Sequence, residues 1–252
     1  MSIDPTQRFS NRVDDYVRYR PSYPAELISR MQERYGWDSD TLIADIGAGT
    51  GISSLLFLEA GYKVIAVEPN DPMRERAAAL LQAYPGFSVG KGTAEQTGLA
   101  THSVDAIVCA QAFHWMDAAA TRPEWERILK PDGPVVLIWN ERLIETEFEK
   151  VYEALIRTHG RQYVRFDHRN TGMKEIKAFF SPQAVQLDVF VNQQIFDGDG
   201  LRGRLLSSSY MPAAGDEGYE AMIADLAALF SRYQENGHIM IRYETKVYSG
   251  RL

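Results

Sequence analysis

An acidic residue followed by three alternating glycines, Asp45, Gly47, Gly49 and Gly51, stands in the stretch LIADIGAGTGISS. Glycine-rich turns between a strand and a helix commonly bind phosphates, because their free backbone N–H groups point at the anion. A carboxylate about 4 Å from a phosphate would repel it by about 1 kcal/mol in water, and more in a partly buried crevice. An acid at the mouth of this turn therefore favours a ligand that is cationic and free of phosphate.

Two phosphate-binding motifs that use this kind of turn are incomplete here. The dinucleotide fingerprint needs a third glycine for close packing of helix on strand, and Ile52 occupies that position. The phosphate loop needs G-K-[ST], which does not follow the turn. S-adenosylmethionine fits better, because it carries a sulfonium and an ammonium group and no phosphate. A nicotinamide-dependent oxidoreductase is the alternative, because Glu68, about 20 residues downstream, would accept ribose hydroxyls in either class.

The elements that must position these residues alternate along the chain. Continuous apolar segments alternating with helical ones predict a parallel sheet with helices on both faces. The expected strands are 41–46, 62–69, 87–92, 103–113, 134–140, 185–196 and 239–250, and the expected helices are 24–36, 52–61, 71–86, 118–133, 145–160, about 201–206 and 218–237. Asp71 is expected to cap the helix 71–86, with Pro72 at its first position.

Methyl transfer from a sulfonium is an in-line displacement, so alignment and desolvation supply much of its acceleration. A base is needed only where the acceptor must lose a proton, and a carboxylate acceptor needs none. The segment QAFHW ends the fourth strand of the core, near where the methyl group should emerge. His114 is the candidate catalytic residue, as a general base or as a hydrogen-bond donor that orients the acceptor. Trp115 would wall the acceptor pocket or contact the adenosine.

The N-terminal segment YVRYRPSYP is too aromatic and basic for a solvated leader, and its two prolines stiffen it. We therefore expect a lid over the site. Arg20, His114, Arg142 and Arg204 would together make a local basic pocket in an acidic protein, which suits a carboxylate acceptor.

The ordered set of DIGAGTG, an acid ending the second strand, GTAE after the third and VDAIVCAQAFHW as the fourth resembles class I S-adenosylmethionine-dependent methyltransferases. FSNRVDDYVRYRPSYP, GRLLSSSYMP and YETKVYSGRL narrow the resemblance to a small-molecule branch similar to trans-aconitate methyltransferases. The resemblance implies an α/β, Rossmann-like, seven-stranded sheet that is mostly parallel, with an antiparallel last strand and a helical cap.

The resemblance also implies which residues hold the cofactor. The turn from Asp45 to Gly51 would hold the methionine part, Glu68 the ribose, and Ala94 with Glu95 the adenine, which Met73 would also contact unless it belongs to the helix core. The proposed cofactor set is Tyr19, Arg20, Asp45, Gly47, Ala48, Gly49, Gly51, Glu68, Pro69, Met73, Ala94, Glu95, Gln111 and Ala112, and the acceptor set is Tyr16, His114 and Trp115. No metal site is predicted.

Composition excludes several classes. A net charge of −7 and a sequence pI near 5.3 argue against nucleic acid as a partner. No leader-like apolar segment and no run of about 20 apolar residues is present, so a cytoplasmic protein without membrane partners is expected. Cys109 is expected to be a buried apolar side chain.

We expect one domain over 1–252, with a lid and helix (1–36), a cofactor-binding core (37–140) and a completion of the sheet with a helical cap (141–252). A binding module without catalysis stays open.

Overall fold

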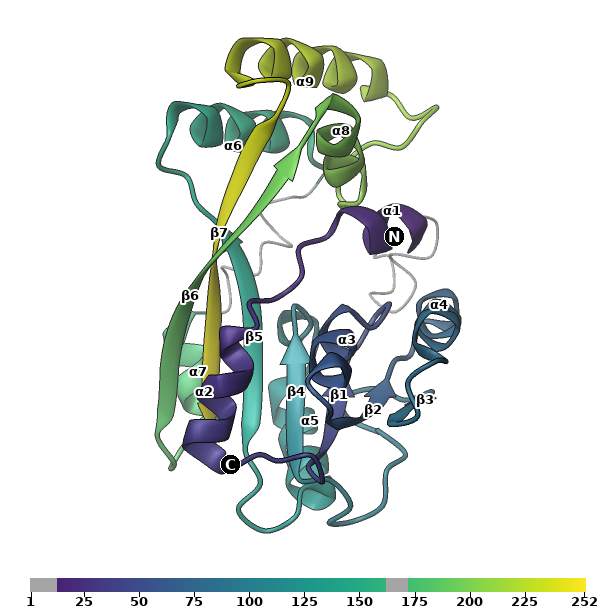
Figure 1. Cartoon of the computed structure of the whole chain (residues 1–252), viewed down its shortest axis with the longest axis vertical. Coiled ribbons are helices and arrows are strands. Elements are labelled where there is room, and N and C mark those ends of the chain that lie inside the picture. The colour runs from purple at the N-terminus through teal and green to yellow at the C-terminus, as the bar shows by residue number, and fades with distance from the viewer. Residues whose placement is uncertain (1–12, 162–171) are drawn as a thin grey trace.

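The computed structural model describes residues 13–161 and 172–252, which form one seven-stranded sheet with the order β3-β2-β1-β4-β5-β7-β6 (Figure 1). The strands are β1 (Leu42–Ile46), β2 (Lys63–Val67), β3 (Phe87–Gly90), β4 (Ala106–Ala110), β5 (Val135–Arg142), β6 (Val185–Phe196) and β7 (Ile239–Gly250). The first five strands run parallel, and β7 pairs antiparallel with both β5 and β6. The predicted mostly parallel, Rossmann-like sheet with an antiparallel last strand is confirmed.

Helices cover both faces of the sheet because both faces of its central strands are apolar. One face packs against α2 (Glu26–Tyr35) and α3 (Ile52–Glu59), and the other against α5 (Ala118–Ile128) and α7 (Met173–Phe180). Alternation along β1 sends Ala44 and Ile46 into the α5 and α7 side, so Asp45 points to the α3 side. α4 (Asp71–Leu81) follows β2.

The two longest strands carry a second layer of helices beyond the core. β6 and β7 have 12 residues each, and they continue together past the end of β5 (Figure 1). Their extension packs with α6 (Glu147–His159), α8 (Gly198–Leu206) and α9 (Tyr219–Tyr233) in a separate apolar cluster, which we call the cap. α1 (Val13–Tyr19) lies beside α8, so the N-terminal segment reaches the cap.

One predicted helix start is wrong. Asn70, not Asp71, caps α4, because the Asn70 side chain accepts a hydrogen bond from the Met73 backbone N–H at 3.0 Å. Asp71 is already helical and forms ion pairs with Arg74 and Lys91 at 2.6 and 3.0 Å. Its acidic charge at the first turn still complements the helix dipole.

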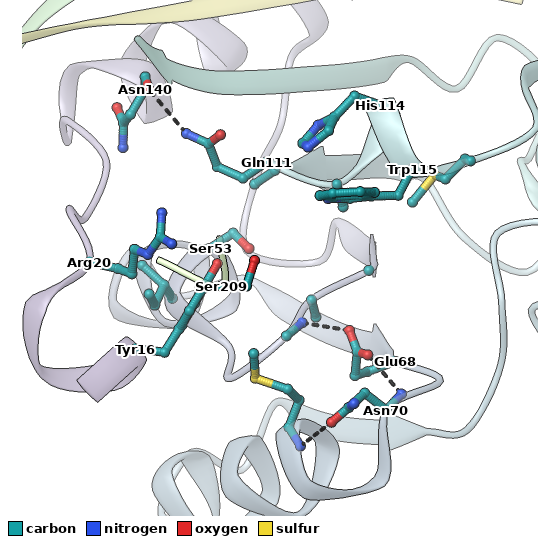
Figure 2. Close-up of a pocket in the computed structure, with 18 of the residues that line it drawn as sticks. Tyr16, Arg20, Ser53, Glu68, Asn70, Gln111, His114, Trp115, Asn140 and Ser209 are labelled. Carbon is teal, nitrogen blue, oxygen red and sulfur yellow. Dashed lines mark hydrogen bonds between the residues drawn. The ribbon is translucent and has the colours of Figure 1, made fainter. Parts of the chain in front are cut away.

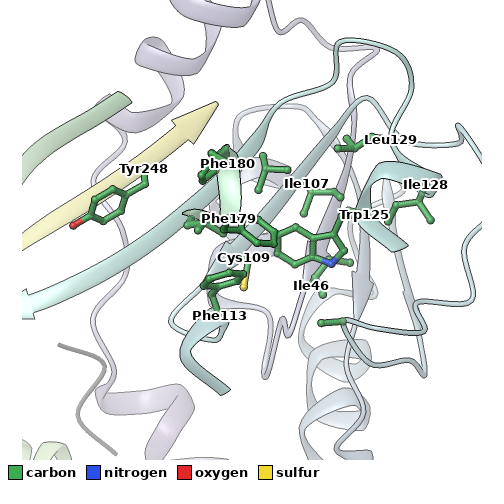
Figure 3. Packing of buried hydrophobic residues seen from close by; sticks show 14 of the residues in the cluster. Ile46, Ile107, Cys109, Phe113, Trp125, Ile128, Leu129, Phe179, Phe180 and Tyr248 are labelled. Atoms are coloured by element: carbon green, nitrogen blue, oxygen red, sulfur yellow. The ribbon is translucent and has the colours of Figure 1, made fainter. Parts of the chain in front are cut away.

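Two helices were not expected from the sequence, α1 and α7. α7 has only eight residues, and it forms because Phe179 and Phe180 are drawn into the cluster around Trp125 (Figure 3). The Phe179 ring packs edge-on against the Trp125 ring at a centroid distance of 5.5 Å. Cys109, on β4, is fully buried as predicted, and burial raises the pKa of its thiol.

The fourth strand is shorter than predicted. β4 ends at Ala110, because Gln111 adopts a left-handed backbone conformation with φ 56° and Phe113–Trp115 then form a 3-10 turn. Within the described residues, no helix has the length and apolar character needed to cross a membrane.

Candidate active site

A cavity of about 340 Å³ opens at the carboxyl ends of the parallel strands, between the sheet and the cap (Figure 2). This volume is within the usual range for small-molecule sites. Its lining comes from all three predicted parts of the chain, including Arg20 before β1, Glu68 after β2 and Arg204 on α8. Loops from several strand ends therefore converge on one crevice.

The glycine turn presents bare backbone to the cavity. Gly49 has φ +58°, and a Cβ placed on it would meet nothing within 4 Å, so this side is open for a ligand. Gly47 has φ +70°, and a Cβ there would lie 2.7 Å from the Ala112 Cβ. Gly51 also has a positive φ, but it packs the start of α3 against Leu81 rather than lining the cavity. One glycine therefore serves ligand approach, and the other two serve close packing.

Glu68 ties the glycine turn to the end of β2. Its Oε2 accepts the Gly49 backbone N–H and its Oε1 accepts the Asn70 backbone N–H, each at 2.8 Å (Figure 2). Burial raises the pKa of this carboxyl. The two backbone N–H groups lower the pKa, but by less than burial raises it. A carboxylate oxygen has a second lone pair, so Glu68 can still accept two hydroxyl groups from the cavity.

Asp45 lies beneath the turn rather than at its mouth. Its side chain is fully buried and does not line the cavity. Its Oδ2 accepts the Ser53 and Ser54 hydroxyls at 2.7 and 2.6 Å, while its Oδ1 has no hydrogen-bond partner among the described residues. Burial raises the pKa of Asp45 from 3.8 to about 6. Ser53 itself lines the cavity, so it lies between this buried acid and a ligand.

Two of the residues that line the cavity near Glu68 are apolar and almost fully buried. Met73 is 3% exposed and Ala94 is 5% exposed, and both line the cavity, so the two interpretations of Met73 are compatible. Glu95 also lines it, and its Oε1 accepts the Asp117 backbone N–H at 3.2 Å. An aromatic ring between Met73 and Ala94 would have apolar contacts and one acceptor at its edge.

Residues 44–137 match the sequence family described as a methyltransferase domain. An uncharacterized methyltransferase of Mycobacterium tuberculosis is 40% identical over 139 residues, which are 55% of this chain and 54% of that protein. An uncharacterized methyltransferase-like protein of Schizosaccharomyces pombe is 33% identical over 135 residues, 53% of this chain and 52% of that protein. The chain thus spans about half the length of the curated relatives it matches.

Solved structures with the same fold carry the same kind of description. A putative type II methyltransferase from Anaeromyxobacter dehalogenans aligns with a TM-score of 0.68 at 22% identity, covering 92% of this chain and 98% of that one. A Haemonchus contortus phosphoethanolamine N-methyltransferase, solved with S-adenosylhomocysteine, aligns with a TM-score of 0.58 at 12% identity, covering 99% of this chain and 59% of that one. The chain is therefore similar in sequence to methyltransferase domains over residues 44–137, and it shares its fold with solved proteins described as methyltransferases.

Two guanidinium groups lie at the end of the cavity that faces the cap. Arg20 donates from Nη2 to the Ser207 carbonyl at 2.9 Å and lies over the Tyr16 ring at 4.9 Å, while its buried Nε has no partner among the described residues. Arg204 is 7% exposed and donates to the Tyr243 hydroxyl at 3.2 Å. Burial and the neighbouring Arg204 charge lower the pKa of Arg20. Within 13–161 and 172–252, neither arginine forms an ion pair with a carboxylate.

Arg142 differs from these two arginines although it also lines the cavity. Its Nη2 donates to Glu153 Oε2 at 2.7 Å, and both side chains are largely buried. Its charge is therefore compensated by the protein itself. Among the described residues, Arg142 is thus the one arginine of the predicted basic pocket that pairs with a carboxylate, while Arg20 and Arg204 do not.

His114 and Trp115 form the opposite wall from Tyr16 and Arg20 (Figure 2). The two rings lie 4.7 Å apart, and the Trp139 indole N–H donates to His114 Nδ1 at 3.4 Å. Gln111 lines the cavity with its strained backbone, and its side chain donates to the Asn140 carbonyl at 3.3 Å.

All but three of the predicted site residues line the cavity, and the three are Tyr19, Asp45 and Gly51. Tyr19 faces the cap, where a Cβ on Gly203 would lie 2.1 Å from its ring. The structure adds lining residues that were not in the predicted sets, among them Tyr23, Ser53, Asn70, Asn140, Ser209 and Tyr210. Ser209 and Tyr210 stand in GRLLSSSYMP, a motif in which only Arg204 was predicted to face the site.

Proposed function

We propose that this protein transfers a methyl group from S-adenosylmethionine to a carboxylate of a small-molecule acceptor. S-adenosylmethionine would supply an activated methyl group on a sulfonium. The chain would bind it along the strand ends, hold the acceptor on the cap side, and exclude water between the two. The parts 1–36, 37–140 and 141–252 would act as one catalytic domain, since each contributes lining residues.

The donor set supports this ligand. Gly49 offers open backbone, Glu68 offers acceptor capacity for a ribose diol, and Ala94 with Met73 offers an apolar slot for adenine. The buried Asp45, with an unpartnered Oδ1, gives the turn a negative field that suits an ammonium and opposes a phosphate. Gln111 and Ala112 would contact the methionyl group, and Arg20 would reach both ligands.

The observation that carries the acceptor class is the pair Arg20 and Arg204. Two buried guanidinium groups beside each other repel, and the described residues supply no acid to compensate them. A carboxylate on the acceptor would relieve that repulsion and accept charge-assisted hydrogen bonds. A carboxylate oxygen is also a nucleophile that needs no deprotonation at neutral pH.

Titration calorimetry with S-adenosylmethionine, with NAD as the competing ligand, tests the cofactor. Labelled-methyl transfer to a panel of small mono- and dicarboxylic acids, each paired with its amide, tests the acceptor. We expect the protein to bind S-adenosylmethionine and not NAD, and to transfer the labelled methyl group to the acids but not to the amides. Binding of NAD instead would overturn the proposed class. Transfer to the amides as readily as to the acids would overturn the carboxylate assignment.

A further inference from the structure

His114 meets the cavity from the 3-10 turn after β4, and the chemistry of its ring depends on which nitrogen carries the proton. A neutral imidazole has one N–H donor and one lone-pair acceptor, so a general base must turn its lone pair toward the acceptor. Hydrogen positions are assigned from the partners of the ring. His114 has a partner that settles the assignment.

That partner is Trp139 on β5, whose indole Nε1 lies 3.4 Å from His114 Nδ1. An indole N–H can only donate. The nitrogen of His114 that faces it must therefore hold a lone pair, which places the proton of the neutral ring on Nε2. A proton on Nδ1 would set two donors against each other and leave the buried indole N–H without an acceptor at this contact.

The indole cannot easily turn away from this contact. Trp139 is 2% exposed, and its ring packs edge-on against Phe113 at 6.5 Å and against Tyr248 at 5.7 Å. On the other side the His114 ring lies against Trp115. Both partners of the hydrogen bond are thus held by their neighbours.

We propose that Trp139 fixes His114 in the Nε2–H form, so that His114 acts as a hydrogen-bond donor to the acceptor and not as its general base. Trp139 is then a positioning residue. The inference rests on the proposed function and deepens it, because a donor at this wall suits a nucleophile that arrives already deprotonated. Together with Arg20 and Arg204 across the cavity, His114 would present three donors to an anionic acceptor.

The protein contains an internal reference for this tautomer. His102 places Nδ1 2.7 Å from the Leu129 carbonyl oxygen, which can only accept. The neutral His102 ring therefore carries its proton on Nδ1, opposite to His114. Long-range ¹H–¹⁵N correlation spectra of histidine-labelled protein at neutral pH should show both forms, one for each residue.

The spectrum of the wild-type protein and of Trp139→Phe tests the positioning role. We expect the Nε2–H form for His114 in the wild type and a shift toward a mixture of both tautomers in Trp139→Phe, with His102 unchanged. Unchanged His102 signals also report that the variant is folded. An Nδ1–H form of His114 in the wild type would overturn the proposal, as would an unaltered His114 spectrum in the variant.

Transfer of labelled methyl to the carboxylic-acid panel tests the donor role. His114→Gln keeps an N–H donor without a base, whereas His114→Leu has neither, so we expect at least tenfold more turnover from His114→Gln. Equal loss in both variants would overturn the donor role. Calorimetry with S-adenosylmethionine on the same proteins tests the proposed function separately from the tautomer proposal. If the wild type fails to bind S-adenosylmethionine, the proposed function is contradicted, but the tautomer of His114 can still be measured.

Discussion

The two ends of the cavity are built in different ways. The end beside the glycine turn uses strand-end residues of β1, β2 and β4, with acidic groups such as Glu68 held by backbone N–H groups. The end beneath the cap is basic, and its arginines come from segments far apart in the chain, Arg20 after α1 and Arg204 on α8. The first end is a product of local sequence, and the second exists only once the cap has folded over the sheet.

With its two ends built from separate segments, one domain can keep its cofactor site and change its acceptor site. The acidic end depends on the turn and on two strand ends. The basic end depends on contacts between α1 and α8, such as the hydrogen bond from Arg20 to the Ser207 carbonyl. Changes on one side should therefore leave binding at the other side largely intact.

The largest effect is expected from Arg204→Met. Removal of one member of a buried charged contact costs about 2–5 kcal/mol, so kcat/KM for a carboxylic acid acceptor should fall by at least about 30-fold. The Kd for S-adenosylhomocysteine, measured by calorimetry, should change by less than about threefold. Arg202→Met on the same helix is the control, because Arg202 lies outside the cavity lining. A similar loss of cofactor affinity would contradict the independence of the two ends of the cavity.

Glu68→Gln should act at the other end. The amide loses part of the acceptor capacity for the ribose and weakens the hold on the Gly49 N–H, so S-adenosylhomocysteine affinity should fall about 10- to 100-fold. Calorimetry measures this, and Glu126→Gln on the outer side of α5 should leave the affinity unchanged. If Glu68→Gln alters only the KM for the acceptor, the assignment of the two ends is reversed.

Asp45→Asn should separate stability from cofactor binding. The pKa of Asp45 is raised from 3.8 to about 6 by burial, so the folded state binds more protons than the unfolded state between these values. The contribution of Asp45 to the unfolding free energy is fully present below about pH 4 and is lost as pH rises through 6.

The isosteric amide removes this dependence. Relative to wild type, Asp45→Asn should gain up to about 3 kcal/mol in unfolding free energy between pH 4 and pH 7, measured by urea denaturation. Cofactor affinity should nonetheless fall about tenfold, because the amide lacks the charge that favours an ammonium. Unchanged cofactor affinity would contradict the proposal that the charge of Asp45 favours the ammonium group.

The smallest effect is expected where the cap meets α1. In Gly203→Ala the new Cβ would lie 2.1 Å from the Tyr19 ring, so α1 must shift, at a cost of about 1–3 kcal/mol in thermal or urea unfolding. The KM for the acceptor should rise a few-fold while cofactor affinity stays within about twofold. Gly198→Ala is the control, because its Cβ would meet Phe230 at an ordinary 3.6 Å. Equal behaviour of both variants would contradict the role of α8 in holding α1.

The local sequence pattern was sufficient to predict most residues of the acidic end of the cavity. Glycines 47 and 49 and the acid Glu68 belong to strand-end turns, so their placement follows once β1 and β2 are recognised. The same reasoning misjudged Asp45, because the pattern shows that an acid precedes the turn but not that Ser53 and Ser54 on α3 cover it. It also exchanged Asn70 and Asp71 as the cap of α4, since both residue types are suitable caps one position apart.

From the sequence alone, the succession of the seven strands, most of the helices and the glycine turn with Glu68 could be predicted, because hydrophobic periodicity and turn chemistry are local properties. The helices α1 and α7 could not. Which of the cavity arginines pairs with a carboxylate of 13–161 or 172–252 follows from the tertiary structure alone. Arg142 looks like Arg204 along the chain, and only folding places Glu153 beside one of them and not the other. Burial and pairing depend on contacts between distant segments, so the tautomer of His114 and the charge of the acceptor pocket are properties of the fold.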